Sequence, residues 1–326
     1  MDRRTAVSTL AASLAAAGLP AARAQALAGR TLRFLVGYPS GGVADFIART
    51  ATEGLGAATG STVLVENRPG AAGNIALEAV AKAAPDAGVF GAFGNLQVTM
   101  NPTVPQLAPK GVDPMRELVP VVALADLILM LAVAAPFPAR TLEQFVAKAR
   151  EMGPKLRIGL AGIGTPHHLA VLLIQRALGL EMTLVPYKGG PPMIADAAGG
   201  HLDAVVTTLP VGGPMVAAGK LAWIAVVPPT KIPSLPNVPS LGGLLKGETI
   251  PTGNTIFAPA ATPPAVIAEV HDAVRTLLRS PAVDAKLRAN GLEPLNVPRD
   301  ELPARIRAEA AYMKDFLGKV KVDFST

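Results

Sequence analysis

Short apolar runs alternate along the chain with segments in which apolar residues recur every three to four positions. Runs of four to eight apolar residues indicate buried strands, and a 3.6-residue period indicates helices. This pattern predicts strands at 31–38, 62–66, 89–93, 156–160, 182–186, 204–208 and 223–227. It predicts helices at 44–57, 73–84, 141–152, 166–178, 193–198, 266–278 and 301–318. Such alternation favours an α/β fold of mostly parallel sheets with helices on both faces.

The most apolar internal run covers residues 121–135 and contains one charged residue, Asp126. A membrane-spanning helix needs about 20 apolar residues. We therefore interpret this run as one buried strand or two, and expect no membrane insertion of the mature chain.

The N-terminus has the layout of a secretory signal peptide. Arg3 and Arg4 precede an uncharged, Ala-rich stretch at 5–19, and Ala22-Arg23-Ala24 resembles a cleavage signal. We expect residues 1–26 to be removed and the chain to be exported to the periplasm. The paired arginines are compatible with twin-arginine export as well as the general route. The alternative is an Ala-rich N-terminal helix.

Composition narrows the function classes. The 326 residues are 50% hydrophobic and 17% charged, which fits a folded chain of about two domains. The absence of cysteine excludes disulfides, Cys-based metal sites and a thiol nucleophile. The net charge is +6, falling to +4 without residues 1–26, and its Lys and Arg residues are dispersed. We therefore expect no nucleic-acid partner.

Sequence motifs for catalysis are missing. The chain has no G-x-G-x-x-G after a strand, no Walker A lysine, no H-E-x-x-H and no G-x-S-x-G. Of four histidines, only His167 and His168 are neighbours, and adjacent helical residues point in different directions. We expect no metal, no cofactor and no enzyme activity. The alternative is an exported enzyme that uses His168 or Asp45 as acid or base.

Two glycine-rich segments join a predicted strand to a predicted helix, one at residues 38–42 and one at 159–166. Such a turn leaves backbone N–H groups unpaired at the positive end of the helix dipole. A carboxylate or phosphate can bind there. One such turn on each of two domains would hold an anion from both sides.

Several segments resemble the tripartite tricarboxylate transporter solute-binding family, also called Bug receptors. Residues 36–49 read VGYPSGGVADFIAR, residues 64–73 read LVENRPGAAG, residues 160–169 read LAGIGTPHHL and residues 185–190 read VPYKGG. The order and spacing of the family motifs hold from about residue 31 to 323.

This resemblance implies a two-lobed periplasmic-binding-protein fold (type II) with two crossing strands. Lobe 1 would comprise residues 27–128 and 252–326, and lobe 2 would comprise 129–251. The implied function is capture of a small organic carboxylate between the lobes and delivery to membrane transporter subunits, or to a sensor protein. We expect a monomer.

The resemblance also assigns ligand-binding residues by position. On lobe 1 these are Tyr38, Gly41, Gly42, Asp45 and Asn95; on lobe 2 they are Gly162, Gly164, Thr165, His168, Tyr187 and Lys188. Each has a structural alternative. Asp45 could only complement its helix dipole, and His168 could be a cap or a packed histidine. Thr165 could be only an N-cap, while Tyr187 and Lys188 could be a core residue and a surface charge.

The chain departs from the family at two places near the implied cleft. Thr207 and Thr208 stand where the family has a Phe-Asp pair, and Gly253 and Asn254 stand where it has Trp-Phe. Loss of rings and a carboxylate predicts a pocket that is wider, differently selective or degenerate. The last case leaves open a protein-binding module with a decayed cleft.

Overall fold

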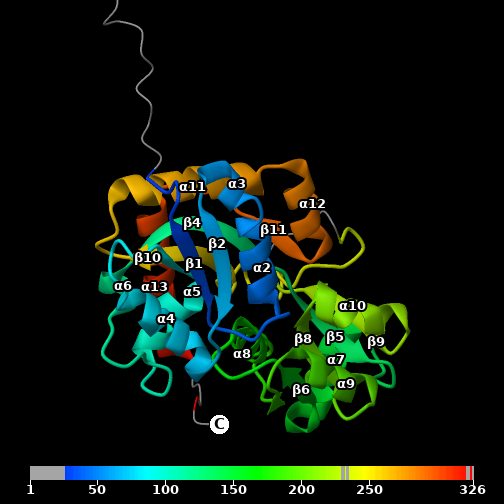
Figure 1. Cartoon of the computed structure of the whole chain (residues 1–326). Coiled ribbons are helices and arrows are strands. Elements are labelled where there is room, and N and C mark those ends of the chain that lie inside the picture. Colours follow the sequence, from blue (N-terminus) through cyan, green and yellow to red (C-terminus); the bar gives the residue numbers. More distant parts are fainter. Residues whose placement is uncertain (1–25, 229–231, 233–234, 321–323, 325–326) are drawn as a thin grey trace, which may run out of the picture.

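The computed structural model describes residues 26–228, 232, 235–320 and 324. Two β-sheets form the framework, and helices cover both (Figure 1). The predicted signal peptide lies outside the described residues, apart from Ala26.

The first sheet has the strand order β11-β4-β10-β3-β1-β2. Its strands are β1 (Thr31–Val36), β2 (Thr62–Asn67), β3 (Val89–Gly94), β4 (Leu118–Leu127), β10 (Gly253–Pro259) and β11 (Leu292–Pro294). The helices that follow these strands are α2 (Val43–Thr52), α3 (Leu55–Thr59), α4 (Asn74–Ala81), α5 (Asn95–Thr99), α6 (Pro114–Glu117), α11 (Pro264–Leu278), α12 (Pro281–Ala289) and α13 (Leu302–Lys319).

The second sheet has the order β7-β6-β8-β5-β9. Its strands are β5 (Leu129–Ala134), β6 (Arg157–Leu160), β7 (Thr183–Pro186), β8 (Ala204–Thr208) and β9 (Leu221–Val226). Helices α7 (Leu142–Met152), α8 (Pro166–Leu178), α9 (Gly190–Ala198) and α10 (Leu209–Ala217) accompany it.

The apolar run at 121–135 forms two strands, in keeping with the second of the two interpretations. β4 lies in the first sheet and β5 in the second, with Ile128 between them. β10 returns the chain to the first sheet, where it pairs antiparallel with both β3 and β4. β5 likewise pairs antiparallel with β8 and β9. These crossing strands make each sheet mixed, while β1–β2, β1–β3, β6–β7 and β6–β8 are parallel as expected.

Most predicted elements form where the periodicity placed them. One exception is the helix expected at 44–57, which divides into α2 and α3. Gly54 separates them with φ of 85°, a left-handed conformation that glycine adopts at little cost. The helices α5 and α10 were not predicted, because α5 has only five residues and α10 contains two glycines and an internal proline, Pro214.

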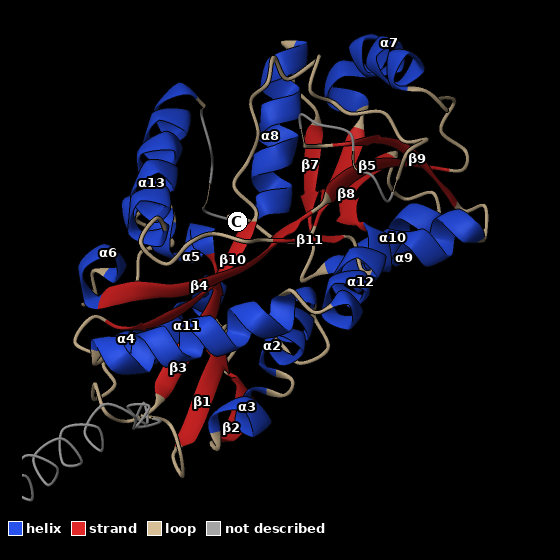
Figure 2. Cartoon of the chain, turned by 90° about the horizontal axis from the view of Figure 1, so that it is seen from above, coloured by secondary structure: helices blue, strands red, loops and turns tan. Residues whose placement is uncertain are grey.

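One apolar cluster joins elements of both sheets. Met313 and Phe316 of α13 and Leu96 of α5 pack with Leu131 of β5 and Leu169 of α8, all of them buried. Figure 2 shows α13 and α8 on the same side of the paired strands β4 and β10. The C-terminal helix therefore contacts both halves of the fold.

Within the described ranges, no helix is both long and apolar enough to span a bilayer.

Candidate functional site

The first glycine-rich turn connects β1 to α2. Gly41 adopts φ of +79°, and its N–H donates to Oδ2 of Asp45 over 3.0 Å. Gly42 is the N-cap of α2, and its N–H donates to the Pro39 carbonyl over 3.4 Å. Both glycine N–H groups are thus used to shape the turn. The first-turn N–H groups of α2, which have no partner within the helix, remain for an anion.

Asp45 is the central acceptor of this turn. It is 3% exposed and accepts from Arg49 Nε at 2.9 and 3.0 Å and from Asn67 Nδ2 at 3.0 Å. Burial alone would raise the pKa of Asp45, but the hydrogen bonds from Arg49, Gly41 and Asn67 outweigh it and hold the pKa below its usual value. Asp45 is therefore an ionised, fully bonded carboxylate whose charge Arg49 neutralises.

Tyr38 is the first residue of the same turn, two residues after the end of β1. Its carbonyl accepts from Asn67 Nδ2 at 3.0 Å, and its ring is half-buried. Burial raises the pKa of the Tyr38 hydroxyl to about 12, so it stays protonated and can donate to a ligand.

The second turn, between β6 and α8, repeats the arrangement of the first. Gly164 adopts φ of +72°, and its N–H donates to Nδ1 of His168 over 3.2 Å. Thr165 is the N-cap of α8: its hydroxyl accepts the His168 N–H and donates to the Gly162 carbonyl over 2.7 Å. Thr165 is thus an N-cap, and its hydroxyl joins Gly162 to the first turn of α8.

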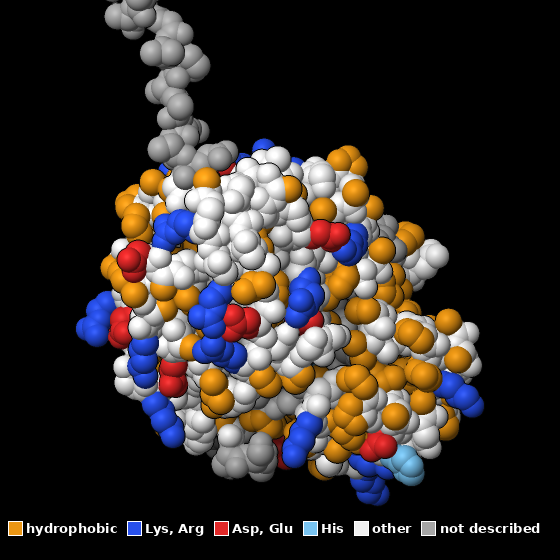
Figure 3. Space-filling model, viewed as in Figure 1, with side chains coloured by type: hydrophobic (Ala, Val, Ile, Leu, Met, Phe, Trp, Pro, Cys, Tyr) orange, Lys and Arg blue, Asp and Glu red, His pale blue; other side chains and the backbone are white. Residues whose placement is uncertain are grey.

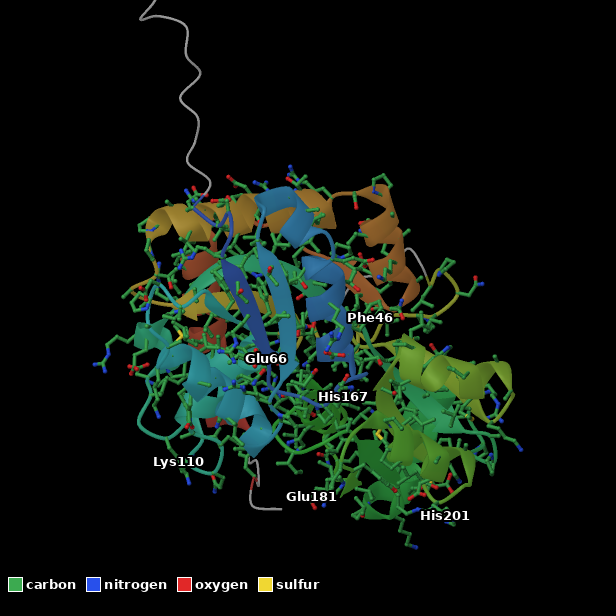
Figure 4. All side chains as sticks on the ribbon, viewed as in Figure 1. Phe46, Glu66, Lys110, His167, Glu181 and His201 are labelled. Carbon is green, nitrogen blue, oxygen red and sulfur yellow. The ribbon has the colours of Figure 1, made fainter. Side chains whose placement is uncertain are left out.

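His168 is 2% exposed, and burial lowers its pKa to about 4. An imidazole that accepts at Nδ1 carries its proton on Nε2. The neighbouring His167 was not among the predicted ligand residues. Its Nδ1 is buried without a hydrogen-bond partner among the described residues, and burial lowers its pKa to about 4 as well. Figure 4 places His167 at the junction between the two halves of the molecule, whereas His201 lies at the periphery.

Tyr187 borders the second turn through its backbone, since its carbonyl lies 3.8 Å from where a Cβ on Gly162 would be. Its hydroxyl donates to Asp196 Oδ2 over 2.7 Å, so its tip is already paired. Burial and the Asp196 carboxylate raise the pKa of Tyr187 to about 12. Lys188 is exposed.

Asn95 opens α5 directly after β3 and is 1% exposed. Its Nδ2 donates to Oε2 of Glu309 over 2.8 Å, while its Oδ1 is buried and unpaired among the described residues. A Cβ on Gly253 would lie 2.6 Å from that Nδ2. Asn95 therefore occupies the space that a side chain at position 253 would need. The replacement of the family's Trp by Gly253 thus does not simply widen the pocket there.

The other departures are also packed. Asn254 is 7% exposed and donates to the Thr252 carbonyl over 3.2 Å. Thr207 and Thr208 are 1% and 3% exposed, and the Thr208 hydroxyl has no partner within the described ranges.

Two residues that the sequence did not single out join the turns to their surroundings. Gln97 is 3% exposed, accepts from the Gly94 N–H over 3.1 Å and fills the space beside Gly37. Leu107 lies against Gly164, where its Cδ1 would be 2.5 Å from an added Cβ. No motif marks either residue, because their role depends on tertiary contacts alone.

The two glycine-rich turns thus sit at the carboxyl ends of β1 and β6, each at the start of a helix. Two open grooves lie on the surface, and the first borders the first turn at Gly41 and Asp45. One, of about 740 Å³, runs between α2, β2 and Lys286, and another, of about 410 Å³, lies between Pro136 and Asp203. In the described part of the chain, no three His, Asp or Glu side chains gather closely enough to hold a metal ion.

The model of the tripartite tricarboxylate transporter family receptors matches residues 47–320. The UPF0065 protein in the gbd 5′ region of Cupriavidus necator is 31% identical over 87% of this chain and 87% of its own. Protein BugT of Bordetella pertussis is 26% identical over 88% of this chain and 89% of its own.

Solved structures of similar proteins also match most of this chain. An R. palustris protein solved with adipate is 28% identical, covers 89% of this chain and 98% of its own, and superposes with a TM-score of 0.81. A periplasmic transporter structure is 29% identical, covers 89% and 97%, and gives a TM-score of 0.78. The periplasmic binding protein BugD, at 24% identity and TM-score 0.78, shares the fold. The predicted fold class is confirmed, and these relatives are binding proteins rather than enzymes. The chain belongs to the tripartite tricarboxylate transporter receptor family.

Proposed function

We propose that this protein is a periplasmic receptor that captures a small organic carboxylate between two lobes and delivers it to a tripartite tricarboxylate-type membrane transporter. Lobe 1 would be residues 27–128 with 252–326, and lobe 2 residues 129–251. The proposal includes removal of residues 1–26 on export and a monomeric mature chain.

The observation that carries the proposal is the matched construction of the two turns. In each, a left-handed glycine donates its N–H to the side chain four residues later: Gly41 to Asp45 and Gly164 to His168. Each turn is thereby fixed before a ligand arrives, which lowers the ordering cost of binding. Each also precedes a helix whose N-terminal dipole favours a carboxylate.

The roles of the predicted residues differ within this proposal. Tyr38, Asn95 and Lys188 keep polar groups that could reach a ligand. Asp45, Gly41, Gly42, Gly164, Thr165 and His168 shape the turns, and Gly162 and Tyr187 form the wall of the second. The adipate complex of the R. palustris relative supports a dicarboxylate of that kind as ligand.

Calorimetry on the mature chain, residues 27–326, against adipate, shorter dicarboxylates, amines and neutral sugars tests this function. A carboxylate at 100 times its dissociation constant should stabilise the fold by about 2.7 kcal/mol. Mass spectrometry of ligand released from freshly purified protein identifies the solute. Binding of amines or sugars alone would refute the proposal, and binding of no solute, with capture of a protein instead, would favour a decayed cleft.

A further inference from the structure

The C-terminal helix contacts the first side of the proposed site through an ion-pair network. Glu309 of α13 accepts from Asn95 Nδ2 over 2.8 Å and from Arg305 Nε over 3.2 Å. Because a carboxylate accepts from the amide nitrogen, Glu309 fixes which end of the Asn95 amide faces it. Asn95 Oδ1 is thereby turned away from Glu309, and it has no partner in the described part of the chain.

The same segment reaches the second side of the site. Tyr312 donates to the Thr249 carbonyl over 2.6 Å, and the guanidinium of Arg176 on α8 lies 5.4 Å from the Phe316 ring centroid. Further along, the Phe324 ring meets the His168 ring edge-to-face, with centroids 5.8 Å apart and planes at 85°. Phe324 also packs against the apolar cluster that contains α8.

His168 accepts the Gly164 N–H that fixes the second turn. The surroundings of the His168 ring therefore affect the stability of this turn. The Gly164 N–H needs an unprotonated Nδ1 as acceptor. A ring that excludes water from His168 favours its neutral form, because burial penalises the imidazolium. No charged side chain contributes to this shift, whose cause is burial.

We propose that Glu309 of α13 and Phe324 are positioning residues for the two sides of the ligand site: Phe324 shields His168 on the second turn, and Glu309 orients Asn95 on the first. This inference rests on the proposed function only for its effect on ligand affinity. The shielding of His168 can be measured without any ligand.

Imidazole titration by NMR on the mature chain tests the first contact. Phe324→Ala should raise the pKa of His168 by about one unit, toward the usual value of about 6.5. Phe324→Trp should restore the low value, because it returns an aromatic ring. Leu317→Ala, which removes apolar packing from α13 on the same cluster, should leave the pKa of His168 unchanged. An unchanged pKa in Phe324→Ala, or an equal rise in Leu317→Ala, would overturn the assignment.

Affinity for adipate, measured by calorimetry, tests the coupling to the site. Phe324→Ala and Glu309→Ala should each weaken binding about fivefold, since aromatic and hydrogen-bond contacts are worth about 1 kcal/mol. Glu309→Gln, which keeps an acceptor, should bind more like the parent, and Glu309→Ala should leave the pKa of His168 in place. If the parent binds no carboxylate, the proposed function fails while the titration result still decides on Phe324. If the parent binds and both Ala variants bind equally well, the positioning role is wrong.

Discussion

The two glycine-rich turns share one backbone design but use different chemistry to hold it. At the first turn the acceptor is Asp45, an ionised carboxylate neutralised by Arg49. At the second it is His168, a neutral imidazole kept uncharged by burial. Neither turn therefore presents a net side-chain charge from its own acceptor, and the helix-start N–H groups can dominate the attraction for an anion. The difference is that only the second turn depends on a proton-sensitive acceptor.

The largest expected effect is on the pH dependence of stability. The unfolded chain has a His pKa of about 6.5, whereas folded His168 titrates near 4. As pH falls below about 6.5 the unfolded state binds the proton first, so the free energy of unfolding decreases down to about pH 4. Because one pKa unit is worth about 1.4 kcal/mol, His168 should account for about 3 kcal/mol of this loss.

Urea unfolding at pH 7 and at pH 4 measures that loss. His168→Gln, which cannot titrate, should lose about 3 kcal/mol less than the parent between these pH values. The exposed His201→Gln serves as control and should follow the parent. An equal loss in all three proteins would show that the second turn is no more proton-sensitive than the rest of the fold.

The first turn should respond to loss of its charge rather than to pH. Asp45→Ala leaves Gly41, Arg49 and Asn67 without their acceptor and should cost about 2 kcal/mol in thermal or urea unfolding at pH 7. Asp45→Asn keeps an acceptor for Gly41 and should cost less. The exposed Asp300→Ala is the matched surface control. A cost in Asp45→Ala no greater than in this control would contradict the account of the first turn.

The side of the site around Asn95 can be tested by adding one methyl group. Gly253→Ala places a Cβ 2.6 Å from Asn95 Nδ2 and should destabilise the fold by about 1–2 kcal/mol, because the amide must move. Gly243→Ala meets open space and should be neutral. A double variant with Asn95→Ala should recover part of the loss. Full tolerance of Gly253→Ala, measured in the same unfolding assay, would mean that the Asn95 position is loosely held.

The smallest effect concerns the helix cap that only the second turn has. Thr165→Ala removes the N-cap of α8 and should cost about 1 kcal/mol. Thr141→Ala removes a comparable cap on α7 and should cost a similar amount. Only Thr165→Ala should also weaken carboxylate binding in calorimetry, since Thr141 caps α7, which starts at neither of the two turns. Equal carboxylate affinity in the two variants would show that the Thr165 cap plays no part in ligand binding.

Local patterns predicted much of this molecule. Strand β8 and helix α8 form at the expected residues, because a run of β-branched residues and a Thr-Pro start are strong local signals. The glycine turns were recognisable because each glycine-rich segment follows a predicted strand and precedes a predicted helix.

The remaining features depend on contacts between distant residues. Nothing near Asn95 in the sequence indicates Glu309, and nothing near His168 indicates Phe324, since each partner lies more than 150 residues further along the chain. The sharing of one apolar cluster between α13 and α8 is likewise a tertiary property. The dispersed charge was evident from composition, and Figure 3 shows Lys and Arg side chains interspersed with acidic ones over the face that carries β1 and β2.

The central claim is that one carboxylate ligand engages both turns at once. Titration of the ¹⁵N-labelled mature chain with adipate, or with whichever carboxylate binds in the calorimetric screen, tests it most directly. The account predicts that the backbone amide signals of Val43 and Ala44 and those of Ile163 and His167 shift together, with one dissociation constant. Shifts confined to one turn, or centred on Val63, Val65 and Lys286 at the far side of the groove beside α2, would contradict it.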